Sequence, residues 1–115
     1  MRTFAAGGSE LLSTITNDAW FGRTSAPYQH FAQASMRAIE NGRYLVRAAN
    51  TGISGIVDPY GRVLAKTDIF TQAVVVGEAR FVRERTVYSR IGDVFAYAST
   101  LLTLAVLVLI RRRVK

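Results

Sequence analysis

The chain carries few residues that could do covalent chemistry. Among its 115 residues there is one histidine, His30, and no cysteine, so the sequence offers no thiol nucleophile, no Cys-ligated metal site and no disulfide. A Ser-His-Asp triad would have to use His30, yet no serine stands in a nucleophile-elbow pattern. A lone histidine at a helix start is more often structural or exposed. The residue types therefore predict no catalytic residue in this chain.

The acidic residues and glycines form no ligand set either. The glycines lack the phosphate-loop pattern, in which a Gly-Lys pair is followed by Ser or Thr. The acids are dispersed, and none has the spacing of a metal-binding loop. We therefore expect no metal site and no cofactor. These acids are Asp18, Glu40, Asp58, Asp68, Glu78, Glu84 and Asp93.

The segment Asn-Asp-Ala-Trp-Phe-Gly at residues 17–22 is different. It follows residues 11–16, an apolar and β-branched run that predicts a buried strand. Ligand sites in α/β sheets lie at the carboxyl ends of strands. Trp20 and Phe21 need an apolar surface to cover, so one interpretation is an apolar wall beside a substrate site. The alternative is that both rings plug the core.

The elements that position this loop follow in order. Residues 28–41 repeat apolar side chains every three or four positions and predict a helix that Gly42 ends. A strand is expected at 44–49, and Asp-Pro-Tyr-Gly at 58–61 predicts the turn of a hairpin. The hairpin strands are expected at 52–57 and 62–66, and a further strand at 71–76. This order is typical of an α/β layer.

The C-terminal part of the chain predicts a transmembrane helix. Residues 94–110 are 17 consecutive uncharged residues, about 25 Å of helix, and the arginines that follow can reach the bilayer surface. The alternative is a buried core helix. Arg111, Arg112, Arg113 and Lys115 supply four of the seven net positive charges, which places the C-terminus in the cytoplasm by the positive-inside rule. The rest is only mildly basic, so we expect no nucleic-acid partner.

Three segments carry a resemblance to a known family. They are ITNDAWFG at 15–22, PYQHFAQASMRAIENGRYLVRAANTGISGIVDPYGRVL at 27–64 and TVYSRIGD at 86–93. In order and with the terminal helix, they resemble the C-terminal third of the apolipoprotein N-acyltransferase family, within the nitrilase (carbon-nitrogen hydrolase) superfamily. Its members transfer an acyl chain from a phospholipid to the N-terminal diacylglyceryl cysteine of a lipoprotein, on the periplasmic face of the bacterial inner membrane.

The resemblance implies an α/β fold: the C-terminal part of a nitrilase-like αββα sandwich, followed by one C-terminal transmembrane helix. Residues 1–77 would be a partial carbon-nitrogen hydrolase domain and 78–93 a linker to the membrane. Residues 94–110 would be the transmembrane helix and 111–115 a cytoplasmic basic tail. Half a sandwich would leave an unpaired strand edge and an uncovered apolar face. We therefore expect the isolated chain to be poorly soluble or proteolysed.

The resemblance also assigns roles. The family's catalytic Cys, Glu and Lys lie upstream of the matched region, so the chain is expected to be an inactive C-terminal fragment. Trp20, Phe21 and Gly22 would form the acyl-site loop, which Asn17 and Asp18 would fix by hydrogen bonds. The implied partners are a phospholipid acyl donor, a lipoprotein acceptor and the bilayer. The alternative function is a non-catalytic, tail-anchored interaction module with a nitrilase-like fold.

Overall fold

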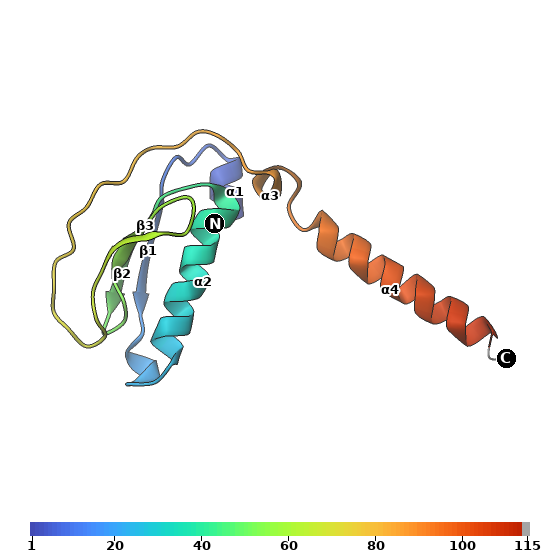
Figure 1. Ribbon diagram of the computed structural model, residues 1–115, viewed down its shortest axis with the longest axis horizontal. Coiled ribbons are helices and arrows are strands. Elements are labelled where there is room, and N and C mark those ends of the chain that lie inside the picture. Colours follow the sequence, from blue (N-terminus) through green and yellow to red (C-terminus); the bar gives the residue numbers. More distant parts are fainter. Residues whose placement is uncertain (114–115) are drawn as a thin grey trace.

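The structure is a computed structural model that describes residues 1–113; residues 114–115 of the predicted basic tail lie outside the described part. Figure 1 shows a small sheet covered by one long helix, with a second long helix extending away from both. The elements are α1 (Arg2–Ala6), β1 (Leu12–Asn17), η1 (Ala19–Phe21), α2 (Ala26–Asn41), β2 (Leu45–Asn50), β3 (Gly55–Val57), β4 (Val63–Lys66), α3 (Val87–Ile91) and α4 (Val94–Arg113).

The four strands form one sheet in the order β1-β2-β3-β4. β1 and β2 are parallel, while β3 pairs antiparallel with β2 and with β4. Parallel neighbours need a crossover connection, and here α2 supplies it, as in a βαβ unit. The structure thus confirms a mixed α/β fold, with strand limits within one residue of those expected except at β3, which begins at Gly55.

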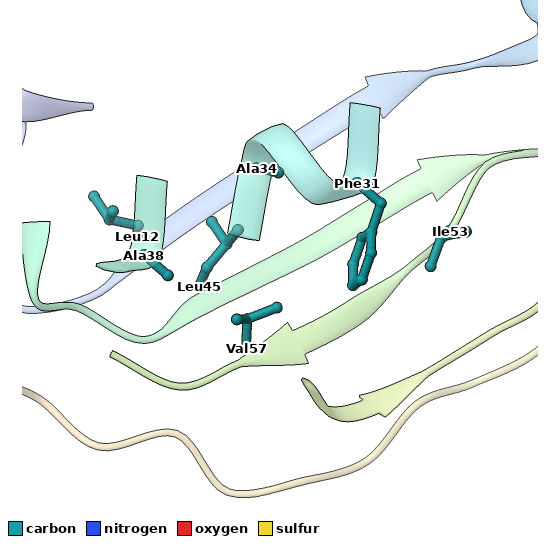
Figure 2. Packing of buried hydrophobic residues seen from close by; sticks show 7 residues of the cluster. All are labelled: Leu12, Phe31, Ala34, Ala38, Leu45, Ile53 and Val57. Atoms are coloured by element: carbon teal, nitrogen blue, oxygen red, sulfur yellow. The ribbon is translucent and has the colours of Figure 1, made fainter. Parts of the chain in front are cut away.

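Helix α2 packs its apolar side on one face of the sheet (Figure 2). Phe31, Ala34 and Ala38 recur at helical spacing and are buried. They meet side chains from β1, β2 and β3, and the whole cluster is Leu12, Phe31, Ala34, Ala38, Leu45, Ile53 and Val57. The helix ends as predicted at Gly42, whose φ of 61° is the left-handed conformation that favours glycine.

The turn between β3 and β4 confirms the hairpin prediction. Gly61 N donates to Asp58 O over 3.0 Å, and Asp58 Oδ1 accepts from the backbone N–H groups of Tyr60 and Arg62, each at 2.9 Å. Burial raises the pKa of the Asp58 carboxyl group, but the hydrogen bonds from Arg62 and Tyr60 outweigh burial and hold that pKa below its usual value.

The prediction of a strand at residues 71–76 is wrong. This segment has no regular secondary structure, and it belongs to a long connection that curves around the sheet (Figure 1). Val74 and Val76 are 90% and 86% exposed. Its β-branched residues favour extended backbone, but a strand exists only where another strand pairs with it, and none lies alongside in the described chain. The short helices α1 and α3 were not predicted.

The face of the sheet opposite α2 is partly open. Ile15 in β1 points to this side and is 89% exposed, and Ala48 of β2 is exposed beside it in the strand register. β1 is also the edge strand of the sheet. An edge strand that exposes an isoleucine on a bare face lacks the covering that soluble domains normally provide.

Helix α4 fits the predicted membrane span. Residues Val94–Arg112 are long and apolar enough to cross a membrane, with a mean hydropathy of 2.0 over the apolar window, and none of that window is buried. Figure 1 shows α4 extending away from the sheet. The described residues therefore do not bury α4 in a core.

Candidate functional site

The aromatic loop, which we define as residues 17–22, leaves the carboxyl end of β1. The backbone makes one turn of 3-10 helix, η1, and Gly22 ends it with a φ of 58°. Trp20 is 86% exposed and Phe21 43% exposed. The rings thus do not plug the core, and the alternative stated for them is wrong.

Two asparagines join the ends of the parallel strands beneath the loop. Asn17 of β1 and Asn50 of β2 are partners in the strand register. Asn17 Oδ1 accepts from Asn50 Nδ2 and from the backbone N–H of Ala19, both at 3.1 Å. The second bond spans two residues, as in an Asx turn. One side chain thus connects the first residue of η1 to the neighbouring strand.

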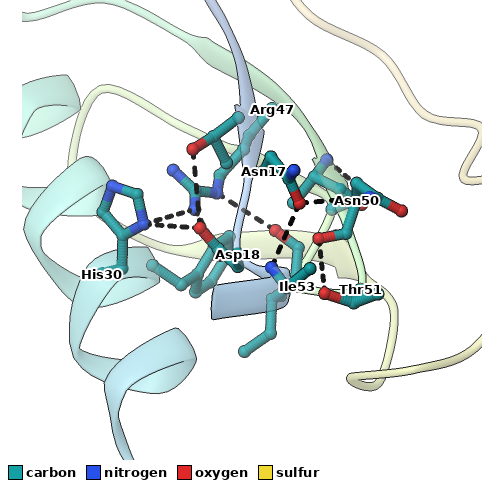
Figure 3. A network of polar contacts seen from close by, with 12 residues as sticks. Asn17, Asp18, His30, Arg47, Asn50, Thr51 and Ile53 are labelled. Carbon is teal, nitrogen blue, oxygen red and sulfur yellow. Dashed lines mark hydrogen bonds and ion pairs between the residues drawn. The ribbon is translucent and has the colours of Figure 1, made fainter. Parts of the chain in front are cut away.

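Asp18 lies at the centre of a buried polar cluster (Figure 3). Its Oδ2 accepts from Arg47 Nη2 of β2 at 3.0 Å, and its Oδ1 lies 2.8 Å from His30 Nδ1 of α2. Asp18 and Arg47 are 1% and 3% exposed. A buried carboxylate needs a paired cation and further donors, and this cluster provides both.

The distances also fix the hydrogen-bonding role of His30. A carboxylate only accepts hydrogen bonds, so His30 Nδ1 must carry the proton that it donates to Asp18. Arg47 Nη2 lies 3.2 Å from the same nitrogen. Because both nitrogens are donors, they do not bond to each other, and both donate to the Asp18 carboxylate instead. The imidazole ring meets Phe21 edge to face, with centroids 6.2 Å apart. His30 therefore links the buried cluster to an aromatic residue of the loop.

The turn after β2 closes the cluster from the other side. Arg47 Nε donates to Ile53 O at 3.1 Å. Thr51 has a φ of 59°, a strained conformation for a β-branched residue, and its carbonyl accepts from Phe70 N at 2.8 Å. Gly52 lies against Asp18, where an added Cβ would be 2.1 Å from Oδ2. The position thus requires glycine for space.

This arrangement can hold an apolar surface but offers no chemistry of its own. Asp18 is fully engaged, and no serine or threonine hydroxyl contacts His30 within residues 1–113. The groove of about 1080 Å³ lies at the opposite ends of the strands, beside Tyr44 and Thr86, and neither Trp20 nor Phe21 lines it. The loop is therefore an exposed apolar patch on a rigid polar base.

Sequence reasoning singled out Asn17, Asp18, Trp20, Phe21 and Gly22, and the structure brings all five into this one loop. It missed Arg47, Asn50 and Gly52 and gave His30 no role. One signal was available: Arg47 is the only charge in an otherwise apolar strand, and such a charge requires a buried partner.

The sequence profile of the carbon-nitrogen hydrolase family matches residues 1–88, which include the sheet, α2 and the aromatic loop. The chain belongs to the carbon-nitrogen hydrolase family. The match covers the segments at 15–22 and 27–64 and the long connection after β4, and it ends at residue 88, within the segment at 86–93.

Relatives within this family are bacterial proteins named apolipoprotein N-acyltransferase. The protein from Geobacter metallireducens is 53% identical over 97 residues, which is 84% of this chain and 19% of the relative. Those from Bradyrhizobium diazoefficiens and Pseudomonas aeruginosa LESB58 are 48% and 39% identical over 100 and 104 residues, covering 18% and 20% of each relative. The chain spans about a fifth of the length of the curated relatives it matches. The names of these carbon-nitrogen hydrolase relatives do not favour the alternative of a non-catalytic interaction module.

Proposed function

We propose that this chain is the part of an apolipoprotein N-acyltransferase that carries the aromatic loop of the acyl site and a membrane anchor. The main support is the exposure of Trp20 and Phe21 on a loop that the buried Asp18–Arg47 ion pair and the contact between Asp18 and His30 hold in place. An apolar patch on a rigid base suits an acyl chain, because the burial of each methylene contributes about 0.8 kcal/mol without requiring a polar partner.

The whole protein would transfer an acyl chain from a phospholipid to the N-terminal diacylglyceryl cysteine of a lipoprotein. That transfer proceeds through a nucleophile that holds the acyl group, and this chain contains no cysteine. We therefore propose that the chain binds part of the phospholipid substrate but does not catalyse by itself. Incubated alone with phospholipid and a diacylglyceryl peptide, it should produce no acylated peptide.

We further propose that the sheet is one half of an αββα sandwich within residues 1–77. The bare face around Ile15 supports this, since a second sheet packed there would bury it, and a strand added beside β1 would pair its free edge. Residues 78–93 would then lead to the membrane.

The span of α4 would place the sheet on the periplasmic side of the bacterial inner membrane and residues 111–115 in the cytoplasm. The uncharged span with arginines directly after it supports this orientation. A single cysteine introduced by Ser25→Cys can test it, because the chain has no other. A membrane-impermeant maleimide should label Ser25→Cys in intact spheroplasts; labelling only after lysis would contradict the orientation.

Trp20 is the only tryptophan, so its fluorescence tests contact with an acyl chain directly. The full chain would be placed in bilayers of phosphatidylethanolamine and phosphatidylcholine whose acyl chains carry bromine, a contact quencher. We expect bromine to quench Trp20. The matched control moves the tryptophan to an exposed position on the long connection, through Trp20→Phe combined with Val74→Trp. Equal quenching of the two proteins, or none of Trp20, would overturn the acyl-binding role.

A further inference from the structure

The aromatic rings of the loop have no polar anchor of their own. Trp20 is almost fully exposed, and the ring of Phe21 meets that of His30 in a T-shaped arrangement. Their direction must therefore come from the residues beneath them. In Figure 3 the side chains of Asp18, His30 and Arg47, from the loop, α2 and β2, point toward one another.

We propose that Asp18, His30 and Arg47 are positioning residues that set the conformation of the aromatic loop from inside the protein. The inference deepens the proposed function and rests on it for the identity of what the loop holds. The three residues would not contact the acyl chain or the reacting atoms. They would act by keeping Trp20 and Phe21 in one arrangement, so that an acyl chain meets a formed surface and not a mobile one.

Asp18 connects the loop to two elements at once. Its backbone N–H donates to Asn50 O at 3.1 Å, while its two carboxylate oxygens face His30 and Arg47. The residue directly precedes η1, so the contacts of its side chain and backbone hold the start of the turn that carries Trp20. Because Asp18 is buried, the loss of a partner leaves one of its carboxylate oxygens without the hydrogen bond that holds it in the folded protein.

Arg47 uses the fork of its guanidinium group. Nε donates to Ile53 O at 3.1 Å and Nη2 to Asp18 Oδ2 at 3.0 Å, so one planar group joins the turn after β2 to the loop after β1. A lysine has one nitrogen and no such fork, so Arg47→Lys keeps the charge but cannot make both contacts in the same geometry.

His30 gives a milder test, since its side chain is 38% exposed and its removal leaves the core and the Arg47 ion pair in place. His30→Ala removes both the donor to Asp18 and the edge contact to Phe21. His30→Asn restores an N–H donor near the position of Nδ1. Comparison of His30→Asn with His30→Ala therefore shows how much of the effect is due to the hydrogen bond with Asp18.

The readout is the steady-state fluorescence anisotropy of Trp20 in the full chain in detergent micelles. A micelle tumbles slowly, so fast local motion dominates any loss of anisotropy. We expect about a twofold fall for His30→Ala and for Arg47→Lys, since a released loop moves on the nanosecond scale, and substantial recovery for His30→Asn. Far-UV circular dichroism should stay unchanged for the His30 variants. Arg37→Ala, at an exposed ion pair with Glu40 on the same helix, is the control and should leave the anisotropy unchanged.

An anisotropy equal to wild type in His30→Ala, with the fold intact, would overturn the positioning role of His30. Should Arg47→Lys fail to fold, the His30 pair still decides the question. Failure of the proposed function would appear elsewhere. If brominated lipid does not quench Trp20 in the wild type while the anisotropy falls in His30→Ala, the loop is positioned as inferred but does not hold an acyl chain.

Discussion

Replacement of Gly52 by alanine should destabilise the fold through the side chain of Asp18. An added Cβ would lie 2.1 Å from Asp18 Oδ2, 2.7 Å from its Cγ and 2.8 Å from its Cβ. Ordinary contact begins near 3.4 Å, so Oδ2 would have to retreat by about 1.3 Å, the difference between the two distances. Gly52 itself is buried and cannot turn outward.

Such a shift would strain or break the contacts that Asp18 makes. The hydrogen bond to Arg47 is already 3.0 Å long, so a retreat of that size can carry it beyond bonding distance. Overpacking a core costs about 1 to 3 kcal/mol. Removing one partner of a buried ion pair costs about 3 to 5 kcal/mol. Gly52→Ala displaces Asp18 but does not remove it, so its cost should lie below the upper end of that range. We therefore expect Gly52→Ala to lower the free energy of unfolding by about 2 to 4 kcal/mol.

The assay is urea unfolding of the full chain in detergent micelles, followed by circular dichroism. Gly7→Ala is the control, because Gly7 is exposed, has a φ of −77° and would bring its Cβ no closer than 3.3 Å to another residue. A double-mutant cycle with Asp18→Ala isolates the mechanism, since that variant removes Oδ2 and Cγ. If Gly52→Ala costs the same free energy in both backgrounds, the proposed clash with the Asp18 carboxylate is refuted.

Two further outcomes are expected elsewhere in the fold. The hydrogen bonds to Asp58 hold its pKa below the ordinary value of 3.8, so its contribution to stability is complete above that value and is lost as the pH falls through the lower folded-state pKa. The urea concentration at the unfolding midpoint should therefore decrease as the pH is lowered from about 5 to about 2. The decrease should be less steep in Asp58→Asn, and parallel pH curves for the two proteins would argue against this contribution of Asp58. Buried Arg43 donates to Ser9 O at 2.8 Å and also to the carbonyl of Glu84, which fastens the connection before α3. Arg43→Met should speed tryptic cleavage at residues 80–85 by about tenfold while exposed Arg37→Met does not, and equal rates would show that other contacts hold the segment.

The fold could be predicted from the sequence wherever a local pattern fixes the structure. The turn at Asp58 rests on residues within four positions of one another, and the end of α2 on the conformational freedom of Gly42. The helical period placed Phe31 and Ala38 in the core. Ile39 also follows the three- and four-residue spacing, but it is 48% exposed and borders the groove near Tyr44. Whether a residue at the edge of the apolar side of α2 is buried depends on how far the neighbouring elements extend over the helix.

In the candidate site, too, some residues could be predicted from the sequence and others could not. The aromatic pair could be found because Trp20 and Phe21 stand in a loop directly after a strand. The residues beneath them could not, since Arg47 lies 29 positions from Asp18 and His30 lies 12 positions from it. The prediction of a strand at 71–76 was wrong for the same reason, because a strand forms only if a segment distant in the sequence pairs with it.

The sequence by itself determined that the chain has no thiol, that it has an apolar helix long enough to cross a membrane, and that an aromatic loop follows a strand. These are properties of composition and of short-range order along the chain. Only the tertiary structure decided that the loop is exposed and that one buried carboxylate, supported by an arginine and a histidine from other elements, holds it. The Asp18–Arg47 ion pair depends on the pairing of β1 with β2, and no local pattern records which strands pair.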